Sequence, residues 1–482
     1  MTTAQQALLH SASQPVAALS VDVVVRQRAR MHPGRVALRM GETACTFAQL
    51  MRRVDRLAQV LHGAGVRHGD RVAILAESRF EYLEAVLAAS TLGAILACCN
   101  TRQSVAELDH CLRLTAPLLM LASERHAGRL SEIAACPSRC IVFGREYEAA
   151  LARAGDDPVP SCAASEDGHL IMFTSGTTGF PKAAVLSHRA EIARAMIGAV
   201  DGQLYPGRGS IVWSPLYHIA GGEHALGLLM QGDPVFLVDG FQPAELVAIM
   251  AREELGTVSL MPAAVGQVVD EIKRTGLRPR SVMACGSRAD LVPRQLIAEA
   301  SALLNAGYRN SFGSTEAGQP PASRHRFAPG EVPTRMSKIQ SSYCAVRLVD
   351  ETDVDVPDGM PGEVLVRGPS LFSGYWGDAA ATNEAFRGGW YHMGDLMVRN
   401  PDGTLDFVDR RKYLIKSGGE NIYPAEIERV LYADARIKDA AVVRQADPHW
   451  GEVPVVFVVA NDPGLGAADV TDLCARRCGI AP

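Results

Sequence analysis

The most informative segment of the chain is Ile171-Met-Phe-Thr-Ser-Gly-Thr-Thr-Gly-Phe-Pro-Lys-Ala-Ala-Val-Leu-Ser-His188. An apolar run ends at Thr174, a loop of glycine and hydroxyl residues follows, and Lys182 precedes the next apolar run. Small residues let backbone N–H groups converge on an anion, while the hydroxyl groups and the lysine add donors and positive charge. A surface turn is the alternative for such a composition. The whole pattern favours a phosphate-binding loop, formed by Thr174, Ser175, Gly176, Thr177, Thr178, Gly179 and Lys182.

This loop is not of the Walker type, because Gly-Lys-Ser/Thr occurs nowhere in the chain. Outward from it, between about Phe47 and Phe312, helical periodicity alternates with short β-branched apolar runs, which is typical of parallel sheets covered by helices. We predict helices at 81–92, 243–254 and 293–304 and strands at 71–76, 94–98, 118–122, 140–144, 170–174, 211–214, 235–238, 258–261 and 282–285. So many strands exceed one open sheet, so the predicted fold class is α/β with two packed sheets.

The composition changes after Pro320, where Gly, Pro and Asp separate short alternating runs such as 344–349 and 362–367. This pattern predicts a small antiparallel, barrel-like β unit over about 321–409. A charged segment, 409–416, follows it. Beyond that, we predict a helix at 425–432, strands at 440–443 and 455–459, and the start of a helix at Asp469. We therefore place a domain boundary at 409–412, between a large domain, 1–409, and a small α+β domain, 413–482.

Composition excludes several classes of function. Among 482 residues, 48 are Lys or Arg and 53 are Asp or Glu, so the net charge of -5 provides neither a basic surface for nucleic acid nor a polybasic membrane anchor. The 11 cysteines are scattered without a CxxC pair, and the first residues resemble neither an export signal nor a transit peptide. We expect reduced thiols, a cytoplasmic location, and a monomer or homodimer.

The whole string from Ile171 to His188 resembles the phosphate loop of the adenylate-forming superfamily, which includes acyl-CoA synthetases, luciferases and amino-acid adenylation domains. The resemblance extends over nearly the whole chain from Val21 onward. It implies that ATP and Mg²⁺ are used to convert a carboxylic acid into an acyl adenylate, and that coenzyme A then accepts the acyl group.

A second motif, Ser311-Phe-Gly-Ser-Thr-Glu-Ala-Gly318, follows a predicted strand at the carboxyl edge of the sheet, where open α/β folds bind ligands. The resemblance implies that Phe312 stacks near the adenine, that Thr315 contacts phosphate and that Glu316 ligates Mg²⁺. A carboxylate beside phosphate oxygens suits that metal. The same motif places Gly313 in the nucleotide and acid sites.

A third motif, Gly389-Trp-Tyr-His-Met-Gly-Asp-Leu396, is similar to the segment whose aspartate accepts both ribose hydroxyls, which implies that role for Asp395. The segment from Asp409 to Glu428 resembles the hinge between the two domains. In the family, the small domain rotates about the hinge after adenylation. This resemblance assigns the hinge to 410–412, with nucleotide contacts from Arg410 and the pivot at Lys412.

Three further residues are implied in coenzyme A binding. Gly418 and Gly419 match glycines that let the thiol arm pass close to the backbone. Trp450, in Ala446-Asp-Pro-His-Trp-Gly-Glu452, matches an aromatic residue near the pantetheine. The alternative for Trp450 is an anchor of the small domain's core.

The acid pocket is predicted from Trp213-Ser-Pro-Leu-Tyr-His-Ile-Ala-Gly-Gly222 and two shorter strings, 261–265 and 285–287. Small residues there leave room for a bulky apolar, cyclic or aromatic acid. Arg288 and Asp290 depart from the family's usual sequence near the adenine. The pocket candidates are His218, Ile219, Ala220, Gly221, Gly222, Ala263 and Gly313, and Gly286 and Ser287 are assigned to the nucleotide.

The predicted activity is that of an AMP-forming acyl-CoA synthetase, with Thr174, Lys182, His218 and Glu316 as its catalytic candidates. Two alternatives remain: a free-standing adenylation enzyme that loads an acyl-carrier protein, and a non-catalytic protein that binds adenylate or acyl-CoA. No Asp lies within 216–222 to hold an α-amine, so an amino acid is disfavoured. Relatives continue past the point that matches 472–482 through a lysine that contacts the carboxylate and the α-phosphate. Two interpretations remain: a shortened form, from which we expect slow adenylation, and a lineage that does without this lysine.

Overall fold

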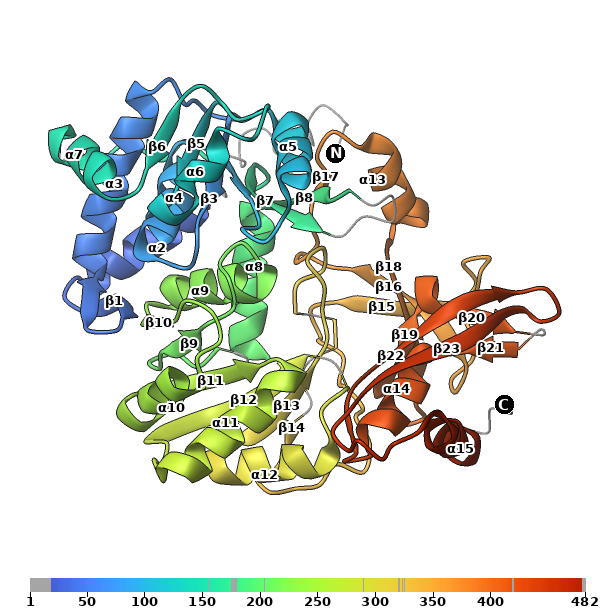
Figure 1. Ribbon diagram of the computed structural model, residues 1–482. Coiled ribbons are helices and arrows are strands. Elements are labelled where there is room, and N and C mark those ends of the chain that lie inside the picture. Colours follow the sequence, from blue (N-terminus) through green and yellow to red (C-terminus); the bar gives the residue numbers. More distant parts are fainter. Residues whose placement is uncertain are drawn as a thin grey trace, which may run out of the picture.

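The computed structural model describes residues 19–155, 157–174, 180–202, 204–288, 290–319, 321–322, 324, 326–417 and 420–478. Two large sheets and their helices form the N-terminal part, and two smaller antiparallel sheets follow toward the C-terminus (Figure 1). The α/β fold class with two large sheets, a small β unit and a C-terminal α+β unit is therefore confirmed.

The first large sheet has seven strands in the order β17-β8-β7-β4-β3-β5-β6. Its five strands from β7 to β6 run parallel and consist of buried apolar runs, whereas β8 pairs antiparallel with both β7 and β17. The segment 171–188 thus forms a hairpin at this sheet. The strand bounds are β3 Arg71–Leu75, β4 Ile95–Cys98, β5 Leu119–Ala122, β6 Cys140–Val142, β7 Gly168–Thr174, β8 Lys182–Ser187 and β17 Gly374–Tyr375.

Two four-stranded sheets, β2-β1-β10-β9 and β11-β12-β13-β14, join into the second large sheet. A parallel bridge between Gly209 and Leu255 connects them. Strands β11, β12 and β13 are parallel and in register, which matters for the site below. The bounds are β1 Val36–Met40, β2 Thr43–Thr46, β9 Ser210–Val212, β10 Val235–Leu237, β11 Glu254–Leu260, β12 Ser281–Arg288, β13 Gly307–Ser311 and β14 Arg326–Phe327.

Helices fill the space between the two large sheets and cover their outer faces (Figure 1). Helices α4 and α9 are almost wholly buried because they are apolar on nearly every side, and α2 packs against both. The bounds are α2 Val21–Met31, α3 Phe47–Gly63, α4 Phe80–Thr91, α5 Val105–Thr115, α6 Glu124–Leu130, α7 Arg145–Arg153, α8 His188–Val200, α9 Ile219–Gln231, α10 Pro243–Arg252, α11 Pro262–Thr275 and α12 Arg294–Leu304.

The remaining chain forms two small antiparallel sheets, β15-β16-β18-β19 and β21-β20-β23-β22. The long hairpin of β22 and β23 packs on α14, which in turn contacts α15. The bounds are β15 Ala345–Val349, β16 Pro361–Arg367, β18 Tyr391–Arg399, β19 Leu405–Arg410, β20 Ile415–Ser417, β21 Glu420–Ile422, β22 Ile437–Asp447, β23 Gly451–Ala460, α13 Ala379–Ala385, α14 Pro424–Tyr432, α15 Ala467–Cys478 and the short 3₁₀ helices η1 Arg387–Gly389 and η2 Arg411–Tyr413.

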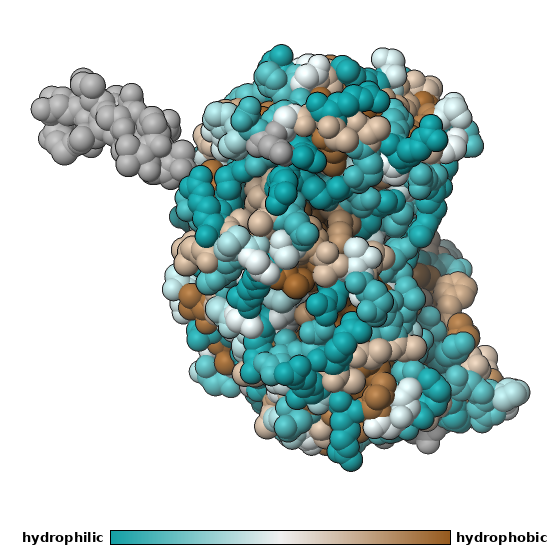
Figure 2. Space-filling view, turned by 90° about the vertical axis from the view of Figure 1, so that its left-hand side faces the viewer, coloured by the Kyte–Doolittle hydropathy of each residue, from teal (hydrophilic) through white to brown (hydrophobic). Residues whose placement is uncertain are grey.

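On the face shown in Figure 2, hydrophilic residues predominate and hydrophobic residues occur in small groups. Among the described residues, none of the helices is both long enough and apolar enough to cross a membrane.

Candidate active site

The phosphate-loop segment joins β7 to β8. Thr174, the last residue of β7, is paired with Lys182, the first residue of β8, and both are half-buried. The hairpin geometry thus brings the two ends of the predicted loop together. Ser175, Gly176, Thr177, Thr178 and Gly179 lie outside the described residues.

Lys182 and Glu316 meet through Tyr375, a residue that the sequence reasoning did not select. The Tyr375 hydroxyl donates to Oε1 of Glu316 at 3.1 Å, and Nζ of Lys182 lies 4.9 Å from the centre of the Tyr375 ring. Burial and the neighbouring Glu316 carboxylate raise the pKa of the Tyr375 hydroxyl, so it stays a proton donor. Tyr375 reaches this position because β17 pairs with β8.

A buried arginine holds the loop that carries Glu316. Nη2 of Arg194, on α8, donates to the carbonyl oxygens of Thr315 and Glu316, each at 3.1 Å. The same guanidinium donates to the Ser370 carbonyl at 2.8 Å and to the Glu223 carboxylate at 3.1 Å. Arg194 therefore links α8, α9 and two loops, and it fixes the backbone of the predicted magnesium ligand.

Phe312 and Gly313 begin the same loop. The half-buried Phe312 ring lies 5.9 Å from the Phe407 ring, centre to centre. A Cβ on Gly313 would collide with the backbone carbonyl of Gly318, so the loop closes on itself only with glycine here. Phe312 and Phe407 thus form an aromatic pair at the start of the loop that carries Glu316.

Asp395 lies on β18 and is only 4% exposed. Burial raises the pKa of its carboxyl to about 6; Arg410, whose Nε lies 3.2 Å from Oδ1, opposes the shift, and the nearby Glu316 carboxylate adds to it. The Asp395 and Glu316 carboxylates are therefore close enough for their charges to interact. A buried carboxyl group with a raised pKa is typical of a binding or catalytic site.

Arg410 and Lys412 lie where the chain passes from the third sheet to the fourth. Arg410 is the last residue of β19, Lys412 lies in η2, and both are exposed. Asp409, by contrast, is buried, and its Oδ2 accepts the backbone N–H of Ala425 at 2.9 Å, which ties the start of α14 to β19. Gly418 and Gly419 lie outside the described residues.

Trp450 lies between β22 and β23 and is 54% exposed. Its ring contacts the His449 ring, with 4.8 Å between the ring centres. A side chain so exposed does not anchor the small domain's core, so that alternative is wrong.

Most of the predicted acid-pocket residues lie at the start of α9, whereas Ala263 lies in α11 and Gly313 follows β13. His218 caps the helix, because its Nδ1 accepts the Ala220 N–H at 3.2 Å, and it is exposed, as is Ala263. Gly221 and Gly222 face the loop at 214–216, where a Cβ on either would meet backbone, and Ile219 is buried.

A small cavity of about 30 Å³ lies between α9 and the second large sheet. Predicted residues Ala220 and Gly286 line it, while Ser287 is buried on β12 beside it. The remaining lining is polar and was not predicted: His224, Thr257, Ser259, Arg309, Ser311 and Gln319.

The unusual residue Asp290 has a structural partner. Its carboxylate pairs with Nζ of the fully buried Lys338 at 2.8 and 2.9 Å and accepts from Nδ2 of Asn310 at 2.7 Å. The departure from the family sequence at Asp290 is therefore part of a buried ion pair. The side chain of Arg288 lies outside the described residues.

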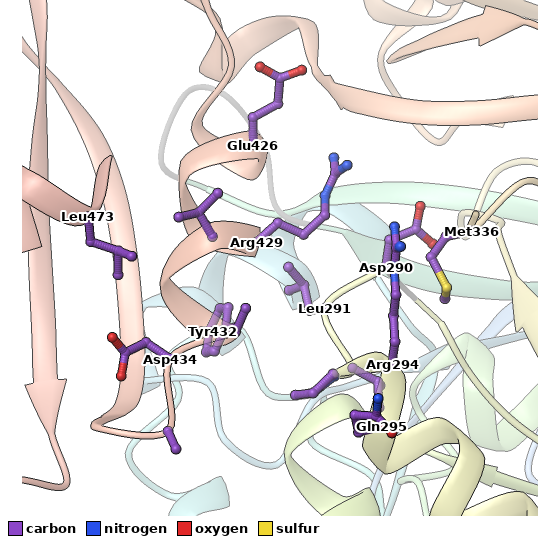
Figure 3. Close-up of a pocket in the computed structure, with 15 residues that line it drawn as sticks. Asp290, Leu291, Arg294, Gln295, Met336, Glu426, Arg429, Tyr432, Asp434 and Leu473 are labelled. Carbon is purple, nitrogen blue, oxygen red and sulfur yellow. The ribbon is translucent and has the colours of Figure 1, made fainter. Parts of the chain in front are cut away.

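A larger pocket, of about 980 Å³, separates this region from α14. Figure 3 shows residues of both sides facing it: Arg429 extends from α14 into the space between the two walls. Asp290, Arg294 and Met336 line one wall, and Glu426, Tyr432 and Leu473 line the other.

The chain matches two family models. Residues 25–376 match the AMP-binding enzyme model, and residues 426–480 match the AMP-binding enzyme C-terminal domain model. It is also similar to the feruloyl-CoA synthase of Amycolatopsis sp., with 35% identity over 441 residues, which cover 90% of this chain and 88% of that one.

Solved structures of acyl-CoA synthetases are also similar to this chain. The o-succinylbenzoate CoA synthetase of Bacillus subtilis, in complex with its acyl-adenylate intermediate, superposes with a TM-score of 0.83 and 26% identity and covers 95% of this chain and 92% of that one. The same enzyme with ATP and magnesium ion gives a TM-score of 0.82 at 26% identity, covering 95% and 93%. The chain belongs to the AMP-binding enzyme family, in its acyl-CoA synthetase branch.

Proposed function

We propose that the chain is an ATP-dependent acyl-CoA synthetase that activates an aromatic or cyclic carboxylic acid. The carboxylate attacks the α-phosphorus of ATP, which gives an acyl adenylate and pyrophosphate. The thiol of coenzyme A then attacks the acyl carbon, which gives the thioester and AMP. The single observation that carries the proposal is the convergence of Lys182, Tyr375, Glu316 and Asp395 from four separate elements on one space.

The nucleotide is proposed to lie along this group of residues. Phe312 supplies an aromatic face for the adenine, and the Asp395 carboxylate accepts from both ribose hydroxyls. Thr174 and Lys182, at the two ends of the hairpin loop, hold the phosphates with Ser175 to Gly179, and Thr315 adds a hydroxyl. Such groups act by placement and by neutralising charge as the carboxylate approaches.

Glu316 is the residue proposed to hold Mg²⁺. Its carboxylate is a hard oxygen donor beside the phosphate-loop lysine, which fits a metal that prefers few carboxylates and many phosphate or water oxygens. When bound, Mg²⁺ neutralises charge on the phosphates. Arg194 and Tyr375 hold the Glu316 backbone and side chain in place.

The second half-reaction is proposed to use a rotation about 410–412, which divides the chain into a large domain, 1–409, and a small domain, 413–482. The pocket of about 980 Å³ between the two supports this proposal, because it leaves their walls out of contact there. Gly418, Gly419 and the exposed Trp450 are proposed to guide the pantetheine arm. The ten cysteines with described side chains are free thiols, which supports the proposed cytoplasmic location.

The acid class is proposed from the relatives. Feruloyl-CoA synthase and o-succinylbenzoate CoA synthetase are named for acids that contain an aromatic ring. His218, Ala220, Ala263 and Gly313 are proposed to surround the ring.

The test combines two assays of the full chain. ATP–pyrophosphate exchange across a panel of aromatic, cyclic and short aliphatic acids reports the first step. Synthetic acyl adenylates supplied with coenzyme A, followed by mass detection, report the second step independently of the first. We expect acyl-CoA from aromatic acids, and a preference for acetate or propionate would overturn the acid class.

The alternatives give different results in the same assays. A carrier-loading enzyme would transfer the acyl group to a phosphopantetheinylated carrier protein and not to coenzyme A. A non-catalytic binding protein would bind AMP but would show neither exchange nor thioester formation, which would overturn the proposed activity.

A further inference from the structure

The small polar cavity between α9 and the second large sheet is lined by a buried cation, Arg309. The cavity shares Ala220 with the predicted acid pocket and Gly286 with the predicted nucleotide site, so it lies beside both. Its volume of about 30 Å³ holds roughly one water-sized group, because about 10–15 Å³ of such volume suffices for a water molecule. The cavity is therefore large enough for the polar tip of a ligand.

A row of three residues explains the cavity. Ser259 on β11 is in register with Gly286 on β12, which is in register with Arg309 on β13. Residues in register on parallel strands point to the same face of a sheet. Because Gly286 has no side chain, the space between Ser259 and Arg309 stays open. A Cβ at Gly286 would approach Cβ of Arg309 to 3.1 Å and would collide with the Arg309 carbonyl.

Arg309 is only 4% exposed, and its Nε and Nη2 atoms have no acceptor with hydrogen-bond geometry in the described part of the chain. The Tyr205 hydroxyl and the Asp201 carboxylate lie near enough to favour the charged guanidinium, but burial outweighs them. Burial lowers the pKa of the guanidinium to about 10, so it remains a cation at neutral pH. Buried charged donors without acceptors are strongly unfavourable. Nε and Nη2 form one edge of the guanidinium, and this edge suits a carboxylate or another oxygen acceptor.

We propose that Arg309 is a specificity residue that binds an oxygen atom at the far end of the carboxylic acid substrate, opposite the carboxylate that is activated. The substrate class is then an aromatic acid that carries a second carboxylate or a ring hydroxyl. The inference rests on the proposed acyl-CoA synthetase activity and narrows its substrate. Ser311, Thr257 and His224 complete the polar wall around that oxygen.

The test uses acyl-sulfamoyl adenosines, which are stable analogues of acyl adenylates. Three matched ring substituents, carboxylate, hydroxyl and methyl, are placed opposite the acyl group in both a benzoyl and a longer cinnamoyl series. Isothermal titration calorimetry of the full chain gives the affinities. We expect at least one oxygenated analogue to bind at least about tenfold more tightly than its methyl counterpart, since polar sites strongly reject analogues that lack the acceptor.

The variant Arg309→Met removes the charge but keeps the length of the side chain. It should bring the affinity ratio to within about twofold while leaving AMP binding unchanged. Arg309→Gln serves if the Met variant does not fold. The matched control is Arg326→Met, because Arg326 pairs with Arg309 across β13 and β14 but is exposed and lies outside the cavity. The control should keep the preference.

Equal binding of the oxygenated and methyl analogues by the natural chain would overturn the inference, as would a preference that survives in Arg309→Met. These results differ from failure of the proposed function. A chain that makes acyl-CoA from these acids without preference disproves only the role of Arg309. A chain that prefers oxygenated analogues but makes no acyl-CoA disproves only the activity.

Discussion

Two buried arginines on the two sides of α9 differ in how their charge is satisfied. Arg194 is 3% exposed, and it donates to three carbonyl oxygens and to the Glu223 carboxylate. Arg309 is 4% exposed, and two of its nitrogen atoms lack an acceptor among the described residues. A satisfied buried cation stabilises and positions the protein around it, whereas an unsatisfied one is available to a ligand. The comparison assigns Arg194 to the architecture of the site and Arg309 to recognition.

The largest effect should come from Arg194→Met. This change leaves the Glu223 carboxylate without its ion pair, removes the positive charge near the buried Glu191 carboxyl, and frees the Thr315 and Glu316 carbonyls. We expect the free energy of unfolding to fall by about 3–5 kcal/mol in urea titrations. Pyrophosphate exchange should fall by at least about 100-fold in the folded fraction, because Glu316 loses its position. Arg194→Lys keeps the charge and should lose less of both, and unchanged stability of the Met variant would contradict the assignment.

A third buried cation, Lys338, tests whether a paired buried charge stabilises the fold as Arg194 is expected to do. Lys338 is 1% exposed and pairs with Asp290, so Lys338→Met leaves a carboxylate whose one remaining side-chain hydrogen-bond partner among the described residues is Asn310. We expect destabilisation of about 3 kcal/mol, and much less in the double variant Lys338→Met with Asp290→Leu, which removes both charges. Differential scanning calorimetry of both variants measures this. Equal losses in the two would show that the pair does not act as a unit.

The raised pKa of Asp395 leads us to expect that nucleoside binding depends on pH. Its pKa is raised to about 6, and only the carboxylate form accepts from both ribose hydroxyls. Adenosine affinity should therefore be constant above pH 7 and should fall by up to about tenfold per pH unit below pH 6. Adenosine is used in place of AMP because it has no phosphate that titrates in this range. Asp395→Asn and 2′,3′-dideoxyadenosine should each bind weakly without this pH dependence, and their retention of it would assign the titration to another group.

The smallest effect should come from Arg309→Met. Because the guanidinium is buried and two of its nitrogen atoms lack an acceptor with hydrogen-bond geometry among the described residues, its replacement by an apolar side chain should change the free energy of unfolding by less than about 1 kcal/mol, or should increase it. Urea denaturation alongside Arg194→Met makes the comparison direct. A loss as large as that of Arg194→Met would mean that Arg309 supports the fold.

Local sequence predicted the strands that are buried on both faces. The central strands β3 to β7 and the strands β9 to β12 are short apolar runs, and hydrophobic patterns identify such strands well. Strands β8 and β17 were not predicted. β17 is two residues long and exists through its pairing with β8, so no local pattern marks it. Tyr375 was missed for the same reason.

The residues of the candidate site likewise fall into two groups, those in local motifs and those identified only by their tertiary contacts. Glu316 and Asp395 lie in local motifs, and the structure brings them toward one space. Arg194 and Arg309 lie inside an ordinary helix and strand, and only their tertiary partners distinguish them. Asp290 departs from the usual family sequence, and its ion-pair partner Lys338 is 48 residues away. The sequence therefore indicates that this position is unusual but does not identify the ion pair that explains it.

In the proposed first step, a carboxylate oxygen of the acid attacks the α-phosphorus of ATP. The most direct test uses an aromatic acid labelled with ¹⁸O in its carboxylate, together with ATP, Mg²⁺ and coenzyme A, and analyses the products by mass spectrometry. We expect AMP to acquire one ¹⁸O atom for each acyl-CoA formed. Unlabelled AMP, or ADP with labelled phosphate, would contradict it.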